Sequence, residues 1–298
     1  MAVAASRPRR VNWTPYLFVA PATVLVLALS VLTTVYTLGV SFTDWAFNRP
    51  GVKIVGLANF QKAVSDAAFR DSLAHSAVFV AGVVIVSLAM GVACALALNE
   101  RVRGRTAVRA VVITPWVLSE VVTGIMWSLL LGPSAGVLTT AARGIGWDPQ
   151  FLSNPVNAMI SLVLVESWRS IGFVMLFILA ALQGIDRTMY EAAHVDGASR
   201  WQRFRFITLP LLMSTILVAT ILLSIGNFNL VTIILSLTGG GPVRHTETAA
   251  LFMWREAFTY FEPGYGAAVA MIMTVLNVAA ALIYIRVLGR RGTTDEAS

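Results

Sequence analysis

The chain has 298 residues, of which 57% are hydrophobic and only 12% are charged. Soluble domains carry roughly 25% charged residues, so this composition excludes a water-soluble globular protein and indicates a protein of the lipid bilayer. The single cysteine, Cys94, excludes an intramolecular disulfide, and the three histidines form no cluster with it at metal-ligand spacing. We therefore expect no metal site and no cofactor bound by this chain.

Six apolar stretches are long enough to cross a bilayer as helices, which takes about 20 residues each. The predicted spans are residues 16–40, 74–98, 110–131, 158–182, 211–237 and 263–285. The first is too long for the apolar core of a signal peptide and is expected to be a retained anchor. We expect an all-α polytopic membrane protein with one transmembrane domain over residues 16–290, between short tails at 1–15 and 291–298.

The basic residues are distributed unequally between the two sides of this predicted bundle. Fourteen of the 22 Lys and Arg residues fall before the first span, after the last span and in the loops 99–109 and 183–210, seven fall in the other loops, and Arg169 lies within a span. Cytoplasmic loops carry the excess of Lys and Arg, so both termini and these two loops are predicted to be cytoplasmic. The same bias explains the net charge of +7 without any nucleic-acid partner.

Span three carries one acid, Glu120, which has no partner within its own predicted helix. It is a candidate either for the transport pathway or for a hydrogen bond to a neighbouring helix. The loop after this span contains Ser134 in a G-x-S-x-G pattern, which is also found in serine hydrolases. An intramembrane serine protease is therefore an alternative, although a turn explains this short pattern more simply, and no histidine lies in a later span.

Spans four and five carry the remaining polar candidates for a pathway. Glu166 and Arg169 are three residues apart, so one helical face can pair them, and they either orient the span or contact a solute. Asn227 and Asn229 in span five could bind a hydroxyl-rich solute, but amides also join neighbouring helices.

The loop 185–210 between spans four and five has the signals of two short helices. Asp186 can cap a helix from Arg187 to about Val195, and Gly197 can end it because glycine adopts the left-handed conformation at low cost. Ser199 and Gln202 form a capping-box pattern that opens a second helix leading toward span five. We expect a rigid helical elbow outside the bilayer.

The second helix of this elbow has an apolar stripe of Trp201, Phe204 and Ile207 beside two arginines. Such a helix can lie on lipid headgroups or dock to a partner protein, and the residues alone leave both interpretations open.

The same loop resembles the EAA loop of the membrane subunits of binding-protein-dependent ATP-binding-cassette (ABC) importers. The matching residues are Glu191-Ala192-Ala193, Asp196-Gly197-Ala198, Phe204, Ile207, Leu209 and Pro210. Two further segments resemble permeases of the maltose and glycerol-3-phosphate type: residues 56–60 before span two and residues 237–268 between spans five and six. The resemblance extends from about residue 15 to residue 290.

This resemblance implies the type I importer permease fold, also called MetI-like, in a bacterial or archaeal cytoplasmic membrane. It implies that the elbow docks to an ATPase subunit, through Glu191, Ala192, Ala193, Asp196, Gly197, Ala198 and Arg203. The implied partners are a second, homologous permease, two ATPase subunits that bind ATP and Mg, and an extracytoplasmic solute-binding protein. The implied solute is a sugar or a polyol phosphate.

The chain itself has no phosphate-binding loop, because neither of its two lysines, Lys53 and Lys62, lies in a G-x-x-x-x-G-K-[ST] pattern. A nucleotide site must therefore lie on another chain if ATP drives transport. A stand-alone secondary transporter, which uses no ATP, is the remaining alternative.

Overall fold

The computed structural model describes residues 14–99 and 104–289. Nearly all of the two predicted tails, and part of the loop 99–109, lie outside the described residues. Within the described ranges the chain forms helices joined by turns, and its one β-contact is an isolated bridge between Thr43 and Ile54. The predicted all-α class is confirmed.

Five helical segments are long and apolar enough to cross a membrane. They are α1 (Thr14–Ser41), α3 (Ala67–Asn99), α7 (Pro155–Gln183), α10 (Leu209–Phe228, with the turns before it) and α13 (Pro263–Gly289). The bent pair α4 (Arg105–Val117) and α5 (Glu120–Leu131) makes a sixth crossing if it is counted as one span. The shorter elements are α2 (Ala58–Ser65), α6 (Val137–Gly144), α8 (Arg187–Val195), α9 (Arg200–Arg203), α11 (Thr232–Leu237) and α12 (Ala249–Trp254), with π-helical turns η1 (Phe204–Thr208) and η2 (Arg255–Thr259).

The expected straight helix over 110–131 is broken. Between α4 and α5 the chain bends by 97°, with Leu118 and Ser119 in extended conformation. Pro115 lies just before the bend and cannot donate a backbone hydrogen bond, which weakens the last turn of α4. The bend makes Glu120 the first residue of α5 instead of a residue deep within a continuous span.

The expected helix over 211–237 is broken as well. α10 ends at Phe228, and α11 begins only at Thr232 after a short irregular link. At the other end, helical structure continues back from α10 through η1 into α9. Most residues at this break are apolar, like the helices on either side, so hydropathy averaged over a window of residues predicted one uninterrupted span.

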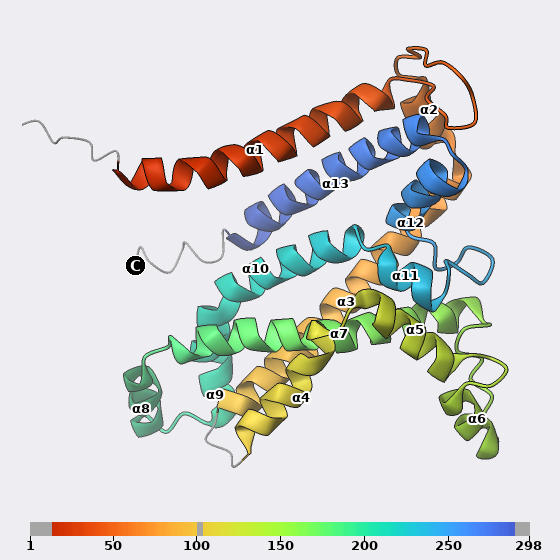
Figure 1. Ribbon diagram of the computed structural model, residues 1–298. Coiled ribbons are helices and arrows are strands. Elements are labelled where there is room, and N and C mark those ends of the chain that lie inside the picture. The colour runs from red at the N-terminus through yellow and green to blue at the C-terminus, as the bar shows by residue number, and fades with distance from the viewer. Residues whose placement is uncertain (1–13, 100–103, 290–298) are drawn as a thin grey trace, which may run out of the picture.

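The long helices share an orientation that gives the bundle two distinct ends (Figure 1). α8 and α9 lie at the left end in this view, together with the start of α1 and the last turn of α13. The helices α2, α5, α6, α11 and α12 lie toward the right. We call these the elbow end and the opposite end.

α7 is the most buried of the long helices, whereas α1 lies against α13 and buries none of its side chains from residue 18 to residue 40. The most extensive helix pairing is that of α3 with α7. Gly91 permits it, because a Cβ at this position would come within 2.4 Å of the side chain of Val174. α7 thus forms the rigid centre on which the charged residues of span four are mounted.

Candidate functional site

The first half of the elbow is α8, whose two ends are fixed by the expected residues. The side chain of Asp186 accepts a hydrogen bond from the backbone N–H of Thr188 at 3.0 Å, and this bond holds the pKa of Asp186 below its usual range. At the other end Gly197 has φ +76°, and the N–H groups of Gly197 and Ala198 donate to the carbonyls of His194 and Ala193 at 3.1 and 2.9 Å. This pair of bonds is the Schellman motif.

The second half of the elbow starts with a capping box. Ser199 Oγ accepts from the backbone N–H of Gln202 at 3.3 Å, and Gln202 Oε1 accepts from the N–H of Ser199 at 2.7 Å. The hydroxyls of Tyr190 and Thr208 lie 2.9 Å apart, which ties α8 to the base of α10. The predicted pair of capped helices is therefore confirmed.

The π-helical turn η1 was not predicted. In it the backbone N–H of Leu209 donates to the carbonyl of Phe204. Pro210 follows directly, and a proline ring collides with the carbonyl four residues earlier in a regular α-helix, here that of Phe206. The wider π turn relieves this collision, so Pro210 was the signal that could have indicated it.

The elbow surface is exposed, and α8 has no buried residue. Five of the seven predicted elbow residues line a shallow pocket of about 340 Å³: Ala193, Asp196, Gly197, Ala198 and Arg203. Glu191 and Ala192 are exposed on α8 outside this pocket.

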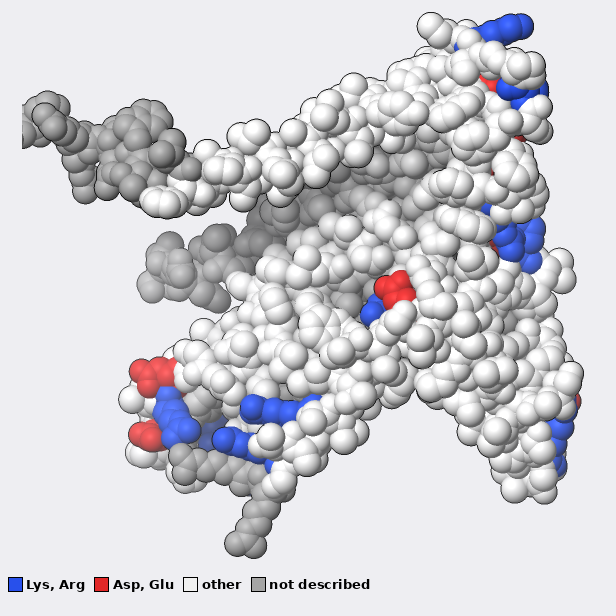
Figure 2. All heavy atoms as spheres, in the orientation of Figure 1, with Lys and Arg blue, Asp and Glu red and all other residues white. Residues whose placement is uncertain are grey.

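A cluster of three charges lies in the middle of the bundle. Glu166 on α7 is 0% exposed, and its two carboxylate oxygens accept from Nε and Nη2 of Arg169 at 2.9 Å each. Ser170 also donates to Glu166 at 2.9 Å, and Arg169 Nη2 lies 3.6 Å from the carboxylate of Glu120. The predicted Glu166–Arg169 pair is confirmed, and Glu120 joins it from a neighbouring helix. In Figure 2, red and blue atoms stand together in the middle of a face whose other charges lie toward its ends.

The bend between α4 and α5 brings Glu120 to the arginine. α4 approaches α7 so closely that a Cβ on Gly172 would lie 2.7 Å from the carbonyl oxygen of Val112. As the first residue of α5, Glu120 also lies at the positive end of that helix's dipole, which stabilises its negative charge.

These charges line a cavity of about 250 Å³ between α4, α5, α7 and α10. The aromatic rings of Trp116 and Phe173 form part of its wall, with ring centroids 5.8 Å apart. Asn227 on α10 also lines it and is 5% exposed. The Nδ2 group of Asn227 donates to the carbonyl of Leu223 at 2.9 Å, whereas its Oδ1 has no hydrogen-bond partner among the described residues.

Four of the five predicted pathway residues therefore meet at this cavity, and Asn229 does not. Asn229 lies just after the end of α10 and accepts a hydrogen bond from Asn277 of α13 at 3.2 Å. Residues two apart on a helical turn face different sides, so Asn227 faces the cavity and Asn229 joins two helices.

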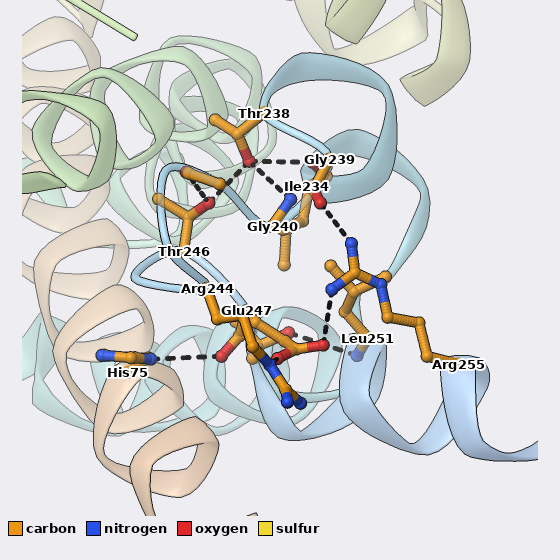
Figure 3. Close-up of polar contacts among 12 residues, drawn as sticks. His75, Ile234, Thr238, Gly239, Gly240, Arg244, Thr246, Glu247, Leu251 and Arg255 are labelled. Carbon is orange, nitrogen blue, oxygen red and sulfur yellow. Dashed lines mark hydrogen bonds and ion pairs between the residues drawn. The ribbon is translucent and has the colours of Figure 1, made fainter. Parts of the chain in front are cut away.

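A second buried charge cluster, to which the sequence assigned no role, fixes the loop between α11 and α12 at the opposite end (Figure 3). Glu247 is 1% exposed and pairs with both Arg244 and Arg255, the latter at 2.7 Å. Arg255 also donates to the carbonyl of Gly239, and the pKa of Arg244 is raised by its hydrogen bond to Glu247. In the sequence, the acidic residue Glu247 within Thr246-Glu247-Thr248 was the signal that could have indicated this charge cluster. These bonds hold the loop between α11 and α12 in one conformation.

Ser134 lies in the turn between α5 and α6, and the described residues show no hydrogen bond between it and a histidine. His75 and His245 lie against each other near Glu247 instead, with ring centroids 5.6 Å apart. The described residues also contain no group of metal-ligating side chains.

Comparisons with known proteins agree with this architecture. The trehalose/maltose transport system permease protein MalF of Thermococcus litoralis is 33% identical over 276 residues, which cover 91% of this chain and 92% of that protein. The sn-glycerol-3-phosphate transport system permease protein UgpA of Agrobacterium fabrum is 32% identical over 281 residues, covering 93% and 95%. Both are transport permeases, and neither alternative, a protease or a stand-alone transporter, is supported.

A solved structure has the same fold. A chain in the crystal structure of a bacterial alginate ABC transporter in complex with an alginate pentasaccharide-bound periplasmic protein superposes with a TM-score of 0.81 at 22% identity, covering 94% of this chain and 96% of that chain. The expected importer-permease fold is confirmed. Residues 85–291 match the family described as binding-protein-dependent transport system inner membrane component. The chain belongs to this family, and it is a permease subunit of an ABC importer.

Proposed function

We propose that this permease imports a sugar or a related polyol phosphate across the cytoplasmic membrane of a bacterium or archaeon. The names of its relatives support this substrate class, since one transports trehalose and maltose and another transports sn-glycerol 3-phosphate. The excess of Lys and Arg supports an orientation with the elbow end and both termini in the cytoplasm.

The observation that carries the proposal is the exposed and rigid elbow. Both ends of α8 are fixed by local hydrogen bonds, and the surface pocket beside it includes Ala193, Gly197 and Ala198, whose small size permits close approach of a partner. A stiff element can transmit a displacement, so the elbow is suited to receive the movement of an ATPase subunit. ATP and Mg bind to that partner, while this chain supplies Glu191, Ala192, Ala193, Asp196, Gly197, Ala198 and Arg203 as the contact surface.

The mid-membrane cavity is this chain's contribution to the pathway. Ionisable residues inside a membrane protein usually face a polar cavity or each other, and Glu120, Glu166 and Arg169 do both. We assign the solute contact to Glu120 and Asn227, and the internal ion pair to Glu166 and Arg169. Asn229 serves as a link between α10 and α13.

Further partners complete the transporter: a second, homologous permease, two ATPase subunits and an extracytoplasmic solute-binding protein. The test is purification of the tagged chain from native membranes, followed by reconstitution into liposomes and uptake assays with sugars and glycerophosphate esters. We expect an ATPase to co-purify and uptake to require ATP. Uptake without ATP, by a chain that co-purifies with no ATPase, would instead identify a secondary transporter.

A further inference from the structure

The arginine of the mid-membrane cavity is paired with two carboxylates. Arg169 donates two hydrogen bonds to Glu166 and forms an ion pair with Glu120. Among the described residues, no other lysine or arginine lines this cavity. Two carboxylates therefore face one guanidinium, and the cluster keeps one excess negative charge when both acids are ionised.

Two side chains, Asn227 and Glu120, present hydrogen-bond acceptors to the cavity. Asn227 Oδ1 is buried and has no partner within the described part of the chain, while the Nδ2 group of the same side chain is engaged by Leu223. The side chain of Glu120 is 33% exposed and borders the cavity. A buried acceptor without a partner is costly, and a solute that brings O–H groups into the cavity removes this cost.

The apolar part of the cavity wall suits a carbon skeleton. The rings of Trp116 and Phe173 lie side by side, and Leu222 and Leu223 of α10 line the same cavity. Small-solute sites commonly combine such apolar walls with a few placed polar groups. This cavity therefore matches a solute with C–H faces and hydroxyl donors.

We propose that the triad of Glu120, Arg169 and Glu166 makes this cavity selective for neutral, hydroxyl-rich solutes and against their phosphate esters. The proposal rests on the proposed function and chooses between the two substrate types of the relatives. A phosphate ester would need a free cation, but release of Arg169 would leave Glu166 buried and unpaired. With Arg169 in place, the phosphate would face the charge of Glu120, and such like-charge contacts are strongly unfavourable.

The test measures solute binding to the purified transporter, which contains its native partner subunits but not the solute-binding protein. The measured affinities then report the selectivity of the membrane site alone. Equilibrium dialysis with radiolabelled solutes compares neutral sugars and glycerol with their own phosphate esters, such as trehalose with trehalose 6-phosphate. The variants are Glu120→Gln, which removes one charge at nearly constant shape, and Asp148→Asn as a matched control. Asp148 also pairs with an arginine, Arg143, but the pair is exposed and lies outside the cavity.

We expect at least one neutral solute to bind at least about tenfold more tightly than its ester. Glu120→Gln should tighten ester binding by about tenfold, because one of the two carboxylates is gone, while Asp148→Asn leaves both affinities unchanged. The proposal would be overturned by equal or tighter binding of the esters, by an unchanged ester affinity in Glu120→Gln, or by the absence of saturable binding of every neutral solute.

Uptake driven by ATP, measured in parallel with the solute-binding protein present, separates this proposal from the one on which it depends. If ATP-driven uptake persists while the cavity prefers esters, only the selectivity is refuted. If no solute is taken up in an ATP-dependent manner, the proposed function fails and the selectivity inference fails with it.

Discussion

Gly197 offers a graded test of the elbow's rigidity. Its φ of +76° lies in the left-handed region, and the two hydrogen bonds that end α8 depend on this conformation. A Cβ at this position would meet no atom within 4 Å, so a substitution there acts through the backbone and not through a clash. The left-handed conformation costs an L-residue roughly 1–2 kcal/mol, and a β-branched residue lies at the upper end of this range.

A cost of about 2 kcal/mol lowers the population of correctly formed elbow about 30-fold relative to its alternatives. We therefore expect ATP-driven uptake to decrease in the order Gly197→Asn, Gly197→Ala, Gly197→Val, because asparagine tolerates the left-handed conformation best and valine least. The assay is uptake by the reconstituted transporter, with size-exclusion chromatography as a check that the permease still inserts and folds.

The matched control is Gly144→Val. Gly144 lies at the end of α6, also has open space around its Cβ position, and has no left-handed φ. This variant should transport like the wild type. Wild-type uptake by Gly197→Val, or equal damage by the asparagine and valine variants, would show that the conformation of the turn does not matter for coupling.

Three further predictions concern stability, measured as thermal or denaturant unfolding of the purified protein in detergent. Glu166→Gln should destabilise the fold by about 3 kcal/mol because it leaves Arg169 with a weakened partner inside the bundle. Neutralising an exposed pair, as in Asp148→Asn, should cost less than about 1 kcal/mol. Equal losses of stability in the two variants would contradict the argument from burial. Gly172→Ala should cost about 1–3 kcal/mol because its Cβ would meet the backbone of α4; an unchanged melting temperature would show that the two helices are not in close contact. Glu256 has a pKa raised chiefly by burial, so the folded protein favours its protonated form and stability is lost as pH rises from its ordinary pKa through the raised value. Glu256→Gln should therefore raise the melting temperature at neutral pH, with the gain disappearing near pH 4, and a pH-independent gain would point to another cause.

The elbow could be predicted from the sequence because its determinants are local. Asp186, Gly197 and the Ser199–Gln202 pair each form hydrogen bonds with residues at most five positions away. Such contacts depend on residue type and spacing, and both can be read directly from the chain. The Glu166–Arg169 pair was predictable for the same reason.

The assembly of the cavity was not predictable from one sequence. The bend before Glu120 is hidden in a uniformly apolar window, and its direction depends on how α4 packs against α7 at Gly172. Asn227 and Asn229 looked equivalent because the end of α10 at Phe228 was not visible. The sequence did not indicate the pairing of Arg255 with Glu247, which depends on how the loop before α12 folds back. These features depend on how the helices and loops pack in three dimensions, which residue type and spacing do not specify.

The most direct test of the account is cross-linking at the elbow. Replacing Cys94, the single cysteine, by serine gives a background in which Ala193→Cys or Ala198→Cys provides one thiol in the elbow pocket. We expect a short bifunctional reagent to join either position to an ATPase subunit in native membrane vesicles, with a yield that changes when ATP is bound. The absence of any ATPase adduct at both positions, in vesicles that still transport, would contradict the claim that this elbow receives the force of ATP hydrolysis.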